Sequence, residues 1–193
     1  MTQPLQSPPV ALPILSDESW HVVRAAERGL HWHPQVRDLL FHWLRLCGSG
    51  GRLPAPAAFD HKLLGELLPY TWLLEIQRAP WRFRYRMAGV AFIDSVGSDV
   101  TGHWYDEARP MAWAANRLRL ITTVRDGVPT WRRGRVPLED RDAETGVRAV
   151  IENLMLPLGS DGIAVDTVLG ISMPYRPIEL WDTPDQGWAE AAD

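Results

Sequence analysis

Residues 81–104 read Trp-Arg-Phe-Arg-Tyr-Arg-Met-Ala-Gly-Val-Ala-Phe-Ile-Asp-Ser-Val-Gly-Ser-Asp-Val-Thr-Gly-His-Trp. Aromatic and apolar side chains alternate with arginines over the first seven residues, so the two kinds point to opposite faces of an extended chain. This period of two predicts a half-buried strand. After Gly89 the apolar residues take a helical period, and Gly97 suits the end of a short helix because glycine accepts a positive φ. The stretch therefore predicts a strand, a tight turn and a short helix.

The segments around this stretch predict an α+β fold of two layers. A short helix is expected over 59–68, with Asp60 as its N-cap, and a longer helix over 111–125. Four further strands are expected, over 70–76, 128–138, 147–158 and 163–173. Strands joined by hairpins pair antiparallel, and helices inserted between strands must cover one face of the sheet. We therefore expect a five-stranded antiparallel sheet covered on one face by inserted helices, with N-terminal flanking helices.

The N-terminal third predicts a helical segment joined to the main domain by a linker. A short helix is expected over 17–28. The helix over 34–47 carries a continuous apolar stripe, made of Val36, Leu39, Leu40, Trp43, Leu44 and Cys47. Glycine and proline then mark a linker. The predicted organisation is a disordered arm (1–15), an N-terminal helical segment and linker (16–56), a compact domain (57–174) and a C-terminal tail (175–193).

The composition is that of one globular domain with tails. Hydrophobic residues make up 46% of the 193 residues and charged residues 23%, which are ordinary values for such a protein. No apolar run approaches the roughly 20 residues of a membrane span. The N-terminus also lacks the basic and apolar regions of a signal peptide. We therefore expect a cytoplasmic protein.

Charge and motifs exclude several classes of function. A net charge of −4 argues against a general nucleic-acid surface, which needs a basic field. The single Cys47 allows no intramolecular disulfide, and its place on an apolar stripe favours a buried, inert thiol. The sequence contains no nucleophile elbow, phosphate-binding loop or zinc-protease motif. We expect no metal site and no enzymatic activity; the alternative is a small enzyme that uses Glu152 or Asp94 as a buried general base.

Three segments resemble a bacterial family of stand-alone PAS domains. They are Phe-Arg-Tyr-Arg-Met-Ala-Gly at 83–89, Val-Gly-Ser-Asp-Val-Thr-Gly at 96–102 and Leu-Leu-Pro-Tyr-Thr-Trp-Leu-Leu-Glu-Ile at 67–76. The resemblance runs from about Pro34 to Met173. The chain departs from the family at Ser98 and His103, where arginine is usual, and at 59–62, where a proline is common.

The resemblance implies a strand order of 2-1-5-4-3 and a ligand held between the sheet and the inserted helices. Such a cavity is mostly apolar with a few polar groups. The side chains best placed to line it are Tyr85, Met87, Phe92, Trp104, Leu118 and Ile121. The alternative is that these side chains fill the space completely and form a plain core.

The resemblance also implies a sensory or signalling module without an output domain, which binds a small molecule, a protein partner or both. A flavin-photoadduct type is disfavoured, because Cys47 is far from the loop after the short helix. Haem is not expected. Its axial ligand would have to be His103, the only histidine inside the PAS core, and His103 lies in a loop where the family usually has arginine. Flanking helices of PAS proteins pack on the sheet or pair between subunits. The candidate surface for a homodimer is the stripe of Val36, Leu40, Trp43 and Leu44, and the arginine face of the strand over 81–87 is a second candidate interface.

Overall fold

Six antiparallel strands form one sheet in the computed structural model, which describes residues 20–23, 32–47, 50–135 and 150–175. The strands are β1 (Trp20–Val22), β2 (Thr71–Arg78), β3 (Trp81–Ala88), β4 (Thr130–Arg135), β5 (Val150–Leu158) and β6 (Thr167–Tyr175). Their order is β1-β4-β5-β6-β2-β3. This order confirms the five expected strands in the implied arrangement, and β1 adds a sixth at the edge beside β4.

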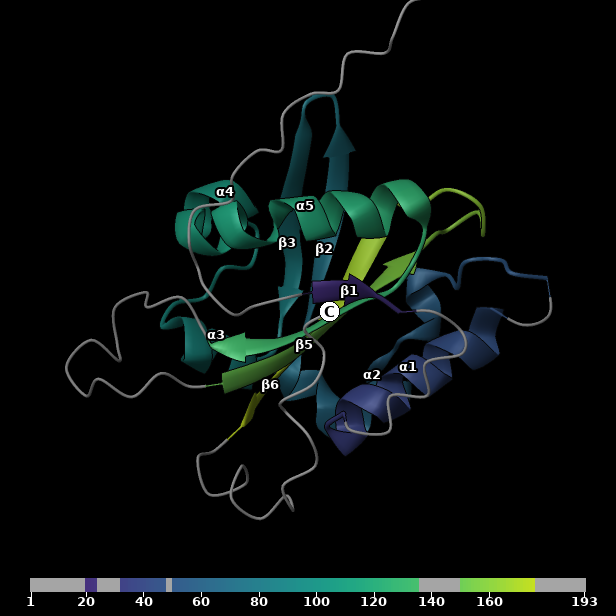
Figure 1. Cartoon of the computed structure of the whole chain (residues 1–193), viewed down its shortest axis with the longest axis horizontal. Helices are drawn as coiled ribbons and strands as arrows, with labels where there is room; N and C mark the ends of the chain where they lie inside the picture. The colour runs from purple at the N-terminus through teal and green to yellow at the C-terminus, as the bar shows by residue number, and fades with distance from the viewer. Residues whose placement is uncertain (1–19, 24–31, 48–49, 136–149, 176–193) are drawn as a thin grey trace, which may run out of the picture.

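Helices cover both faces of the sheet (Figure 1). One face carries α3 (Val90–Val96), α4 (Tyr105–Ala108) and α5 (Pro110–Asp126). The other carries α1 (Pro34–Cys47), α2 (His61–Leu64) and the 3₁₀ segments η1 (Pro56–Ala58) and η2 (Gly65–Tyr70). In the described residues, no helix is both long and apolar enough to cross a membrane.

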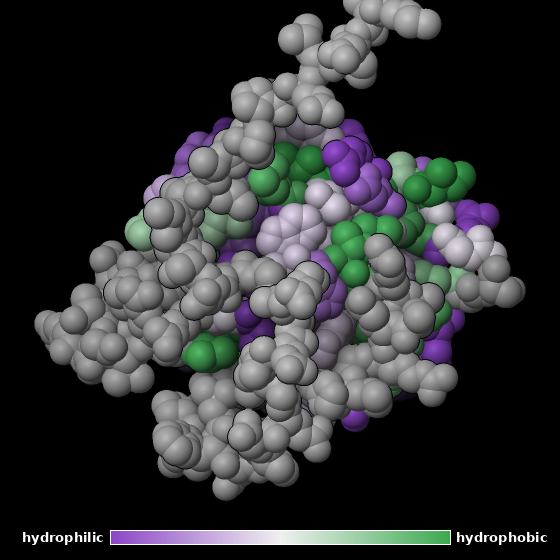
Figure 2. Space-filling view, viewed as in Figure 1, coloured by the Kyte–Doolittle hydropathy of each residue, from purple (hydrophilic) through white to green (hydrophobic). Residues whose placement is uncertain are grey.

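Strand alternation divides the interior into two cores. Along β5, Leu154, Leu156 and Leu158 pack in the core beneath α1, whereas Met155 packs in the core beneath α5. Because successive side chains point to opposite faces, β5 supplies both cores from one buried strand. On the face shown in Figure 2, the hydrophobic residues that are visible form separate groups with hydrophilic residues among them.

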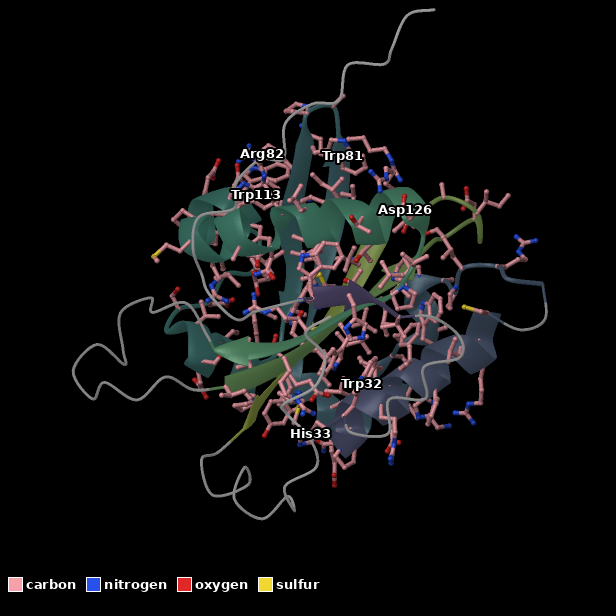
Figure 3. The ribbon with its side chains drawn as sticks, in the orientation of Figure 1. Trp32, His33, Trp81, Arg82, Trp113 and Asp126 are labelled. Carbon is pink, nitrogen blue, oxygen red and sulfur yellow. The ribbon has the colours of Figure 1, made fainter. Side chains whose placement is uncertain are left out.

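Aromatic residues anchor both cores. On the α1 side, Trp32 stacks on Trp131, with ring centroids 4.9 Å apart and planes 5° from parallel. On the α5 side, Trp113 lies 5.8 Å from the ring of Phe83 and 5.9 Å from that of Tyr105. Figure 3 shows Trp32 beside α1 and Trp113 beside α4 and α5, far from each other. The tryptophans thus stabilise two separate cores by burying large apolar surfaces.

Several local predictions are confirmed at the level of hydrogen bonds. The carboxylate of Asp60 accepts the backbone N–H groups of Lys62 and Leu63, at 3.0 and 2.9 Å, and caps α2. Helix α3 ends at Gly97, which has the positive φ of 90° that favours glycine at this position. Short-range capping chemistry is therefore readable in the sequence, because it depends only on neighbouring residues.

The apolar stripe of α1 lies in the core of its own chain and does not form a subunit surface. Val36 and Leu40 are fully buried, and the indole N–H of Trp43 donates to the carbonyl oxygen of Pro157 at 2.8 Å. Leu44 packs against the same cluster. The prediction that these side chains form a homodimer surface is therefore wrong, because they pack against the sheet of their own chain and are not accessible to a second subunit.

The linker after α1 is also part of the domain. The backbone N–H of Leu53 donates to the carbonyl oxygen of Gly162 at 3.0 Å, and the N–H of Gly159 donates to the carbonyl oxygen of Pro54 at 3.0 Å. These bonds join the linker to the turn between β5 and β6, so residues 34–56 do not form a unit separate from the sheet. The predicted arm and tail lie outside the described residues.

The helix predicted over 17–28 is wrong where the structure describes it. Trp20, His21 and Val22 form β1 and pair with Arg132, Trp131 and Thr130 of β4. Aromatic and β-branched residues favour strands, and pairing gives the backbone of β4 hydrogen-bond partners that an edge strand would lack. The remaining residues of that predicted helix lie outside the described residues.

Replacing Leu40 with alanine should lower the free energy of unfolding by about 2–5 kcal/mol, because it removes a fully buried side chain and leaves a cavity. The matched control is Phe41→Ala on the exposed side of the same helix, where Phe41 is 41% exposed, with a loss of less than about 1 kcal/mol. Urea unfolding followed by circular dichroism measures both. Equal losses would contradict the burial of the stripe.

Candidate functional site

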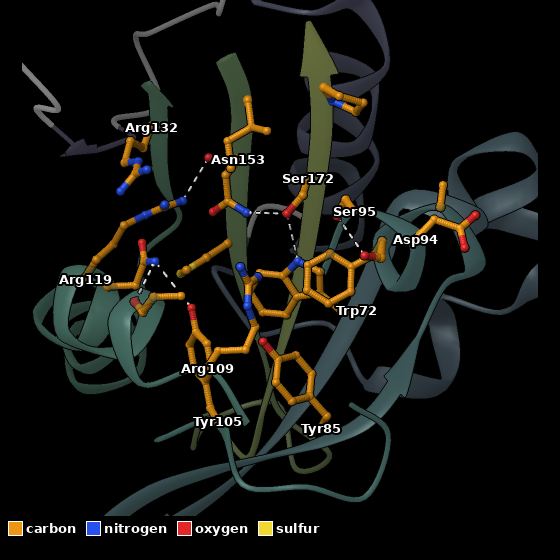
Figure 4. A pocket seen from close by; sticks show the side chains of 17 residues that line it. Trp72, Tyr85, Asp94, Ser95, Tyr105, Arg109, Arg119, Arg132, Asn153 and Ser172 are labelled. Carbon is orange, nitrogen blue, oxygen red and sulfur yellow. Dashed lines mark hydrogen bonds between the residues drawn. The ribbon is translucent and has the colours of Figure 1, made fainter. Parts of the chain in front are cut away.

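A cavity of about 280 Å³ lies between the sheet and helices α3, α4 and α5. Its aromatic and aliphatic walls come from Trp72, Tyr85, Phe92, Ala112 and Met155. Polar groups of α5, β4 and β5 lie on one side of the cavity, where Figure 4 shows Arg119, Arg132 and Asn153, and Asp94 and Ser95 of α3 lie at the opposite end. The side chains therefore do not fill the space as a plain core, and the cavity has an apolar side and a polar side.

The floor of the cavity is the indole of Trp72, which lies directly across β6. Trp72 on β2 pairs with Gly170 on β6. A Cβ atom at position 170 would lie 2.0 Å from Cζ2 of the indole, so only glycine leaves the ring its place. The indole N–H donates to the hydroxyl of Ser172 at 3.1 Å. The side-chain amide of Asn153 donates to the same hydroxyl at 2.8 Å and to the carbonyl of Ile171 at 3.0 Å.

The polar side is built around Arg119, whose side chain is 1% exposed. Its Nε donates to Oγ1 of Thr130 at 3.1 Å, and its Nη2 donates to the carbonyl oxygens of Thr130 and Asn153 at 2.9 and 2.8 Å. Thr123, one turn further along α5, shares a hydrogen bond of 2.8 Å with the hydroxyl of Thr130. Hydrogen bonds from the guanidinium of Arg119 thus hold α5 against β4 and β5, at a position where an apolar side chain is more usual.

Two polar atoms at the cavity wall have no hydrogen-bond partner among the described residues. They are Nη1 of Arg119 and Oδ1 of Asn153. Each belongs to a residue that lines the cavity and is at least nine-tenths buried. Leaving such groups unpaired is costly in a protein interior, so the cavity offers one donor and one acceptor to a bound molecule.

Three guanidinium groups line the cavity. Arg119, Arg132 and Arg109 all line the cavity, and Arg132 is only 4% exposed. Burial, together with the charge of Arg132, lowers the pKa of Arg119 to about 9. The guanidinium therefore remains charged at neutral pH, although burial disfavours its charged form.

Tyr105 adds a neutral hydroxyl to the same side. Burial raises the pKa of its phenol, while the charge of Arg109 acts in the opposite direction. The side-chain amide of Asn116 donates to this hydroxyl at 3.3 Å and to the carbonyl of Ala112 at 2.9 Å. The phenol is thus protonated at neutral pH and has its own hydrogen to donate.

The structure brings two of the six predicted cavity residues to the cavity. Tyr85 and Phe92 line it, and Tyr85 is 2% exposed. Met87 does not, because the β2–β3 register shifts between Leu73 and Leu74: Tyr85 pairs with Leu74, whereas Met87 pairs with Leu73. Leu73 packs on the α1 side of the sheet. Such a bulge reverses the face to which the next residues point, which a strict period of two does not anticipate.

Trp104 is also outside the cavity. Its backbone bridges that of Arg84, and directly paired residues share a face of the sheet. Its ring lies 4.3 Å from the guanidinium carbon of Arg82. The next residue, Tyr105, points inward in its place.

The predicted closing residues of α5 are wrong because the helix presents a different face. Leu118 is 45% exposed and Ile121 is half-buried, and neither lines the cavity. The cavity side of α5 instead carries Ala112, Asn116 and Arg119 at helical spacing, followed by the buried Thr123. The sequence does contain this stripe, but an arginine and an asparagine are ordinarily read as exposed positions.

The two candidate general bases lie apart from the polar side. Glu152 is fully buried on the α1 side, where its Oε1 accepts the backbone N–H of His33 at 2.8 Å and its Oε2 accepts Nε of Arg133 at 2.7 Å. Asp94 is exposed and lines the cavity at the end away from Arg119 (Figure 4). Neither carboxylate therefore lies beside Arg119.

Other candidate residues also lie outside the cavity. His103 is exposed, and Cys47 packs at the end of α1 on the opposite side of the sheet, where burial raises the pKa of its thiol. The arginine face of β3 is paired with carboxylates. Arg84 contacts Glu75 at 2.6 Å, and Arg82 contacts both acidic residues of α4.

Comparison with known proteins agrees with this architecture. A family profile described as a PAS domain matches residues 31–173, which is most of the chain. No curated protein and no solved structure gives a significant match.

Replacing Gly170 with alanine should displace the indole of Trp72 and lower the free energy of unfolding by about 1–3 kcal/mol through overpacking. Near-ultraviolet circular dichroism reports the indole and urea unfolding reports the stability. Gly50→Ala is the control, because nothing lies within 4 Å of a Cβ atom there. An unchanged near-ultraviolet spectrum for the Gly170 variant would contradict the close approach.

Arg133→Met should lower the free energy of unfolding by about 3–5 kcal/mol, since it removes the guanidinium that forms an ion pair with the buried carboxylate of Glu152. The control is Arg84→Met, which removes an exposed ion pair with Glu75 and should cost about 1 kcal/mol or less. Thermal and urea unfolding compare the two variants. Similar small losses in both would show that the carboxylate of Glu152 does not depend on Arg133.

Proposed function

This chain belongs to the PAS-domain family, and we propose that it is a sensory and signalling module that binds a small molecule in the cavity between α5 and the sheet. PAS domains serve as sensory or signalling modules. The observation that carries the proposal is a cavity of about 280 Å³ whose wall holds a buried donor and a buried acceptor, neither of which has a partner in the described part of the chain. A filled core would leave neither group unpaired.

Signalling by this module requires a surface that differs between the free and bound states. Helix α5 is suited to that role, because Asn116 and Arg119 face the cavity while Leu118 on the same helix is 45% exposed. A ligand that moves the inner face of α5 therefore also moves an exposed face. We propose a protein partner, either a second copy of this chain or another protein, that recognises such a surface.

The proposal assigns no catalytic step to the cavity. A general base must lie within hydrogen-bond reach of the proton that it removes. Glu152 lies on the far side of the sheet and is held by Arg133, and Asp94 is exposed at the end away from Arg119. Binding, with its effect on the surface of α5, is the function that this arrangement supports best.

Native mass spectrometry of the freshly purified full chain should detect a bound small molecule that is lost on denaturation. Ala112→Phe, which places a phenyl ring in the cavity from α5, should abolish the bound mass. Ala114→Phe, on the exposed side of the same helix, should keep it. Retention of the bound mass by the Ala112 variant would mean that the molecule binds elsewhere. The same spectra report the oligomeric state.

A further inference from the structure

We propose that the ligand of this cavity is a small carboxylic acid bound as its anion, with the carboxylate on Arg119 and Arg132 and an apolar body over Trp72 and Phe92. The inference rests on the proposed function, because it names the chemical class that the same cavity binds. Three features of the cavity support it: the buried charge of Arg119, the polar atoms without partners among the described residues, and the size of the cavity.

The first feature is the charge. Arg119 is 1% exposed, and its hydrogen-bond acceptors are the neutral oxygens of Thr130 and Asn153. Among the described residues that line the cavity, the one carboxylate belongs to Asp94, which is exposed and lies at the opposite end (Figure 4). A buried cation without an anion is unfavourable. The lowered pKa of Arg119 is consistent with that cost. A bound anion would remove it.

The second feature is the position of the unpartnered atoms. The hydrogen bonds of Nε and Nη2 to β4 and β5 hold the guanidinium of Arg119 in place, and Nη1 has no partner among the described residues. A carboxylate oxygen is a strong acceptor for such a group. Oδ1 of Asn153 needs a donor. The ligand therefore carries a hydroxyl or N–H group close to its carboxylate.

The third feature is size. The cavity of about 280 Å³ equals the volume of on the order of nine water molecules. A molecule with one small ring or a short chain fits such a volume. The rings of Trp72, Tyr85 and Phe92, with centroids 6.0–6.4 Å apart, form the apolar side on which such a body would lie.

A matched set of three probes tests the class on dialysed full-length protein that native mass spectrometry shows to be empty. Mandelate carries a ring, a hydroxyl and a carboxylate; phenylacetate lacks the hydroxyl; mandelamide lacks the charge. Isothermal titration calorimetry should give mandelate the highest affinity, phenylacetate a lower one and mandelamide at least tenfold weaker binding than mandelate. Equal affinities of mandelate and mandelamide, or binding of neither acid, would overturn the proposal. Inorganic phosphate binding more tightly than both acids would also overturn it.

Arg119→Met should weaken mandelate binding at least tenfold, whereas Arg117→Met, an exposed arginine on the same helix, should leave it unchanged. The Arg119 variant also loses the hydrogen bonds to Thr130 and Asn153, so its thermal unfolding is measured beside the titration to show that it is folded. If that variant does not fold, Arg132→Met serves as the second test, with the same expected loss. Unchanged mandelate affinity in the folded variant would overturn the assignment of the anion site.

The two proposals fail in different ways. A bound mass that proves to be a neutral compound, displaced by Ala112→Phe, would keep the sensory cavity and overturn the carboxylate. Mandelate affinity that Ala112→Phe leaves unchanged, together with no bound mass in the wild type, would overturn the cavity itself.

Discussion

A guanidinium buried between α5 and the sheet is the contact on which the shape of this domain depends. Arg119 reaches across the interior and donates to backbone oxygens of two neighbouring strands. A shorter apolar side chain at that position would let the helix settle onto β4 and β5 and close the space. The long polar side chain instead spans the gap, and the cavity lies beside it. Any group that binds Arg119 acts on a helix and two strands at once.

The two faces of the sheet differ in what they bury. On the α1 side the packing is closed: Leu40 and Leu154 are fully buried, and the ion pair of Glu152 with Arg133 is satisfied further by the backbone of His33. On the α5 side a charged group is buried with unpaired atoms beside it. A protein can hold such an unfavourable group when the rest of the fold is stable enough, and the α1 side supplies that stability.

The floor of the cavity illustrates how a single backbone position shapes a site. The indole of Trp72 crosses β6 only because residue 170 has no side chain, and its N–H then meets Ser172. Asn153 donates to the same hydroxyl and keeps its own oxygen toward the polar side. The apolar floor and the polar wall are thus joined by hydrogen bonds through the hydroxyl of Ser172.

The sequence by itself determined the α+β class, the limits of α1 and the caps at Asp60 and Gly97, because these follow from local periodicity and short-range hydrogen bonding. The order of the strands was implied by the resemblance to PAS domains and not by these local patterns. Tyr85 and Phe92 were also predicted at the cavity. Tertiary structure decided the rest. A register shift turned Met87 away, and pairing with β4 made a strand of residues 20–22. The buried Arg119 also places a different side of α5 against the cavity from the predicted side that carries Leu118 and Ile121. Each of these features depends on contacts with residues distant in the sequence. Arg119 in particular is buried because Thr130 and Asn153 accept its hydrogen bonds, and local sequence patterns do not show these partners.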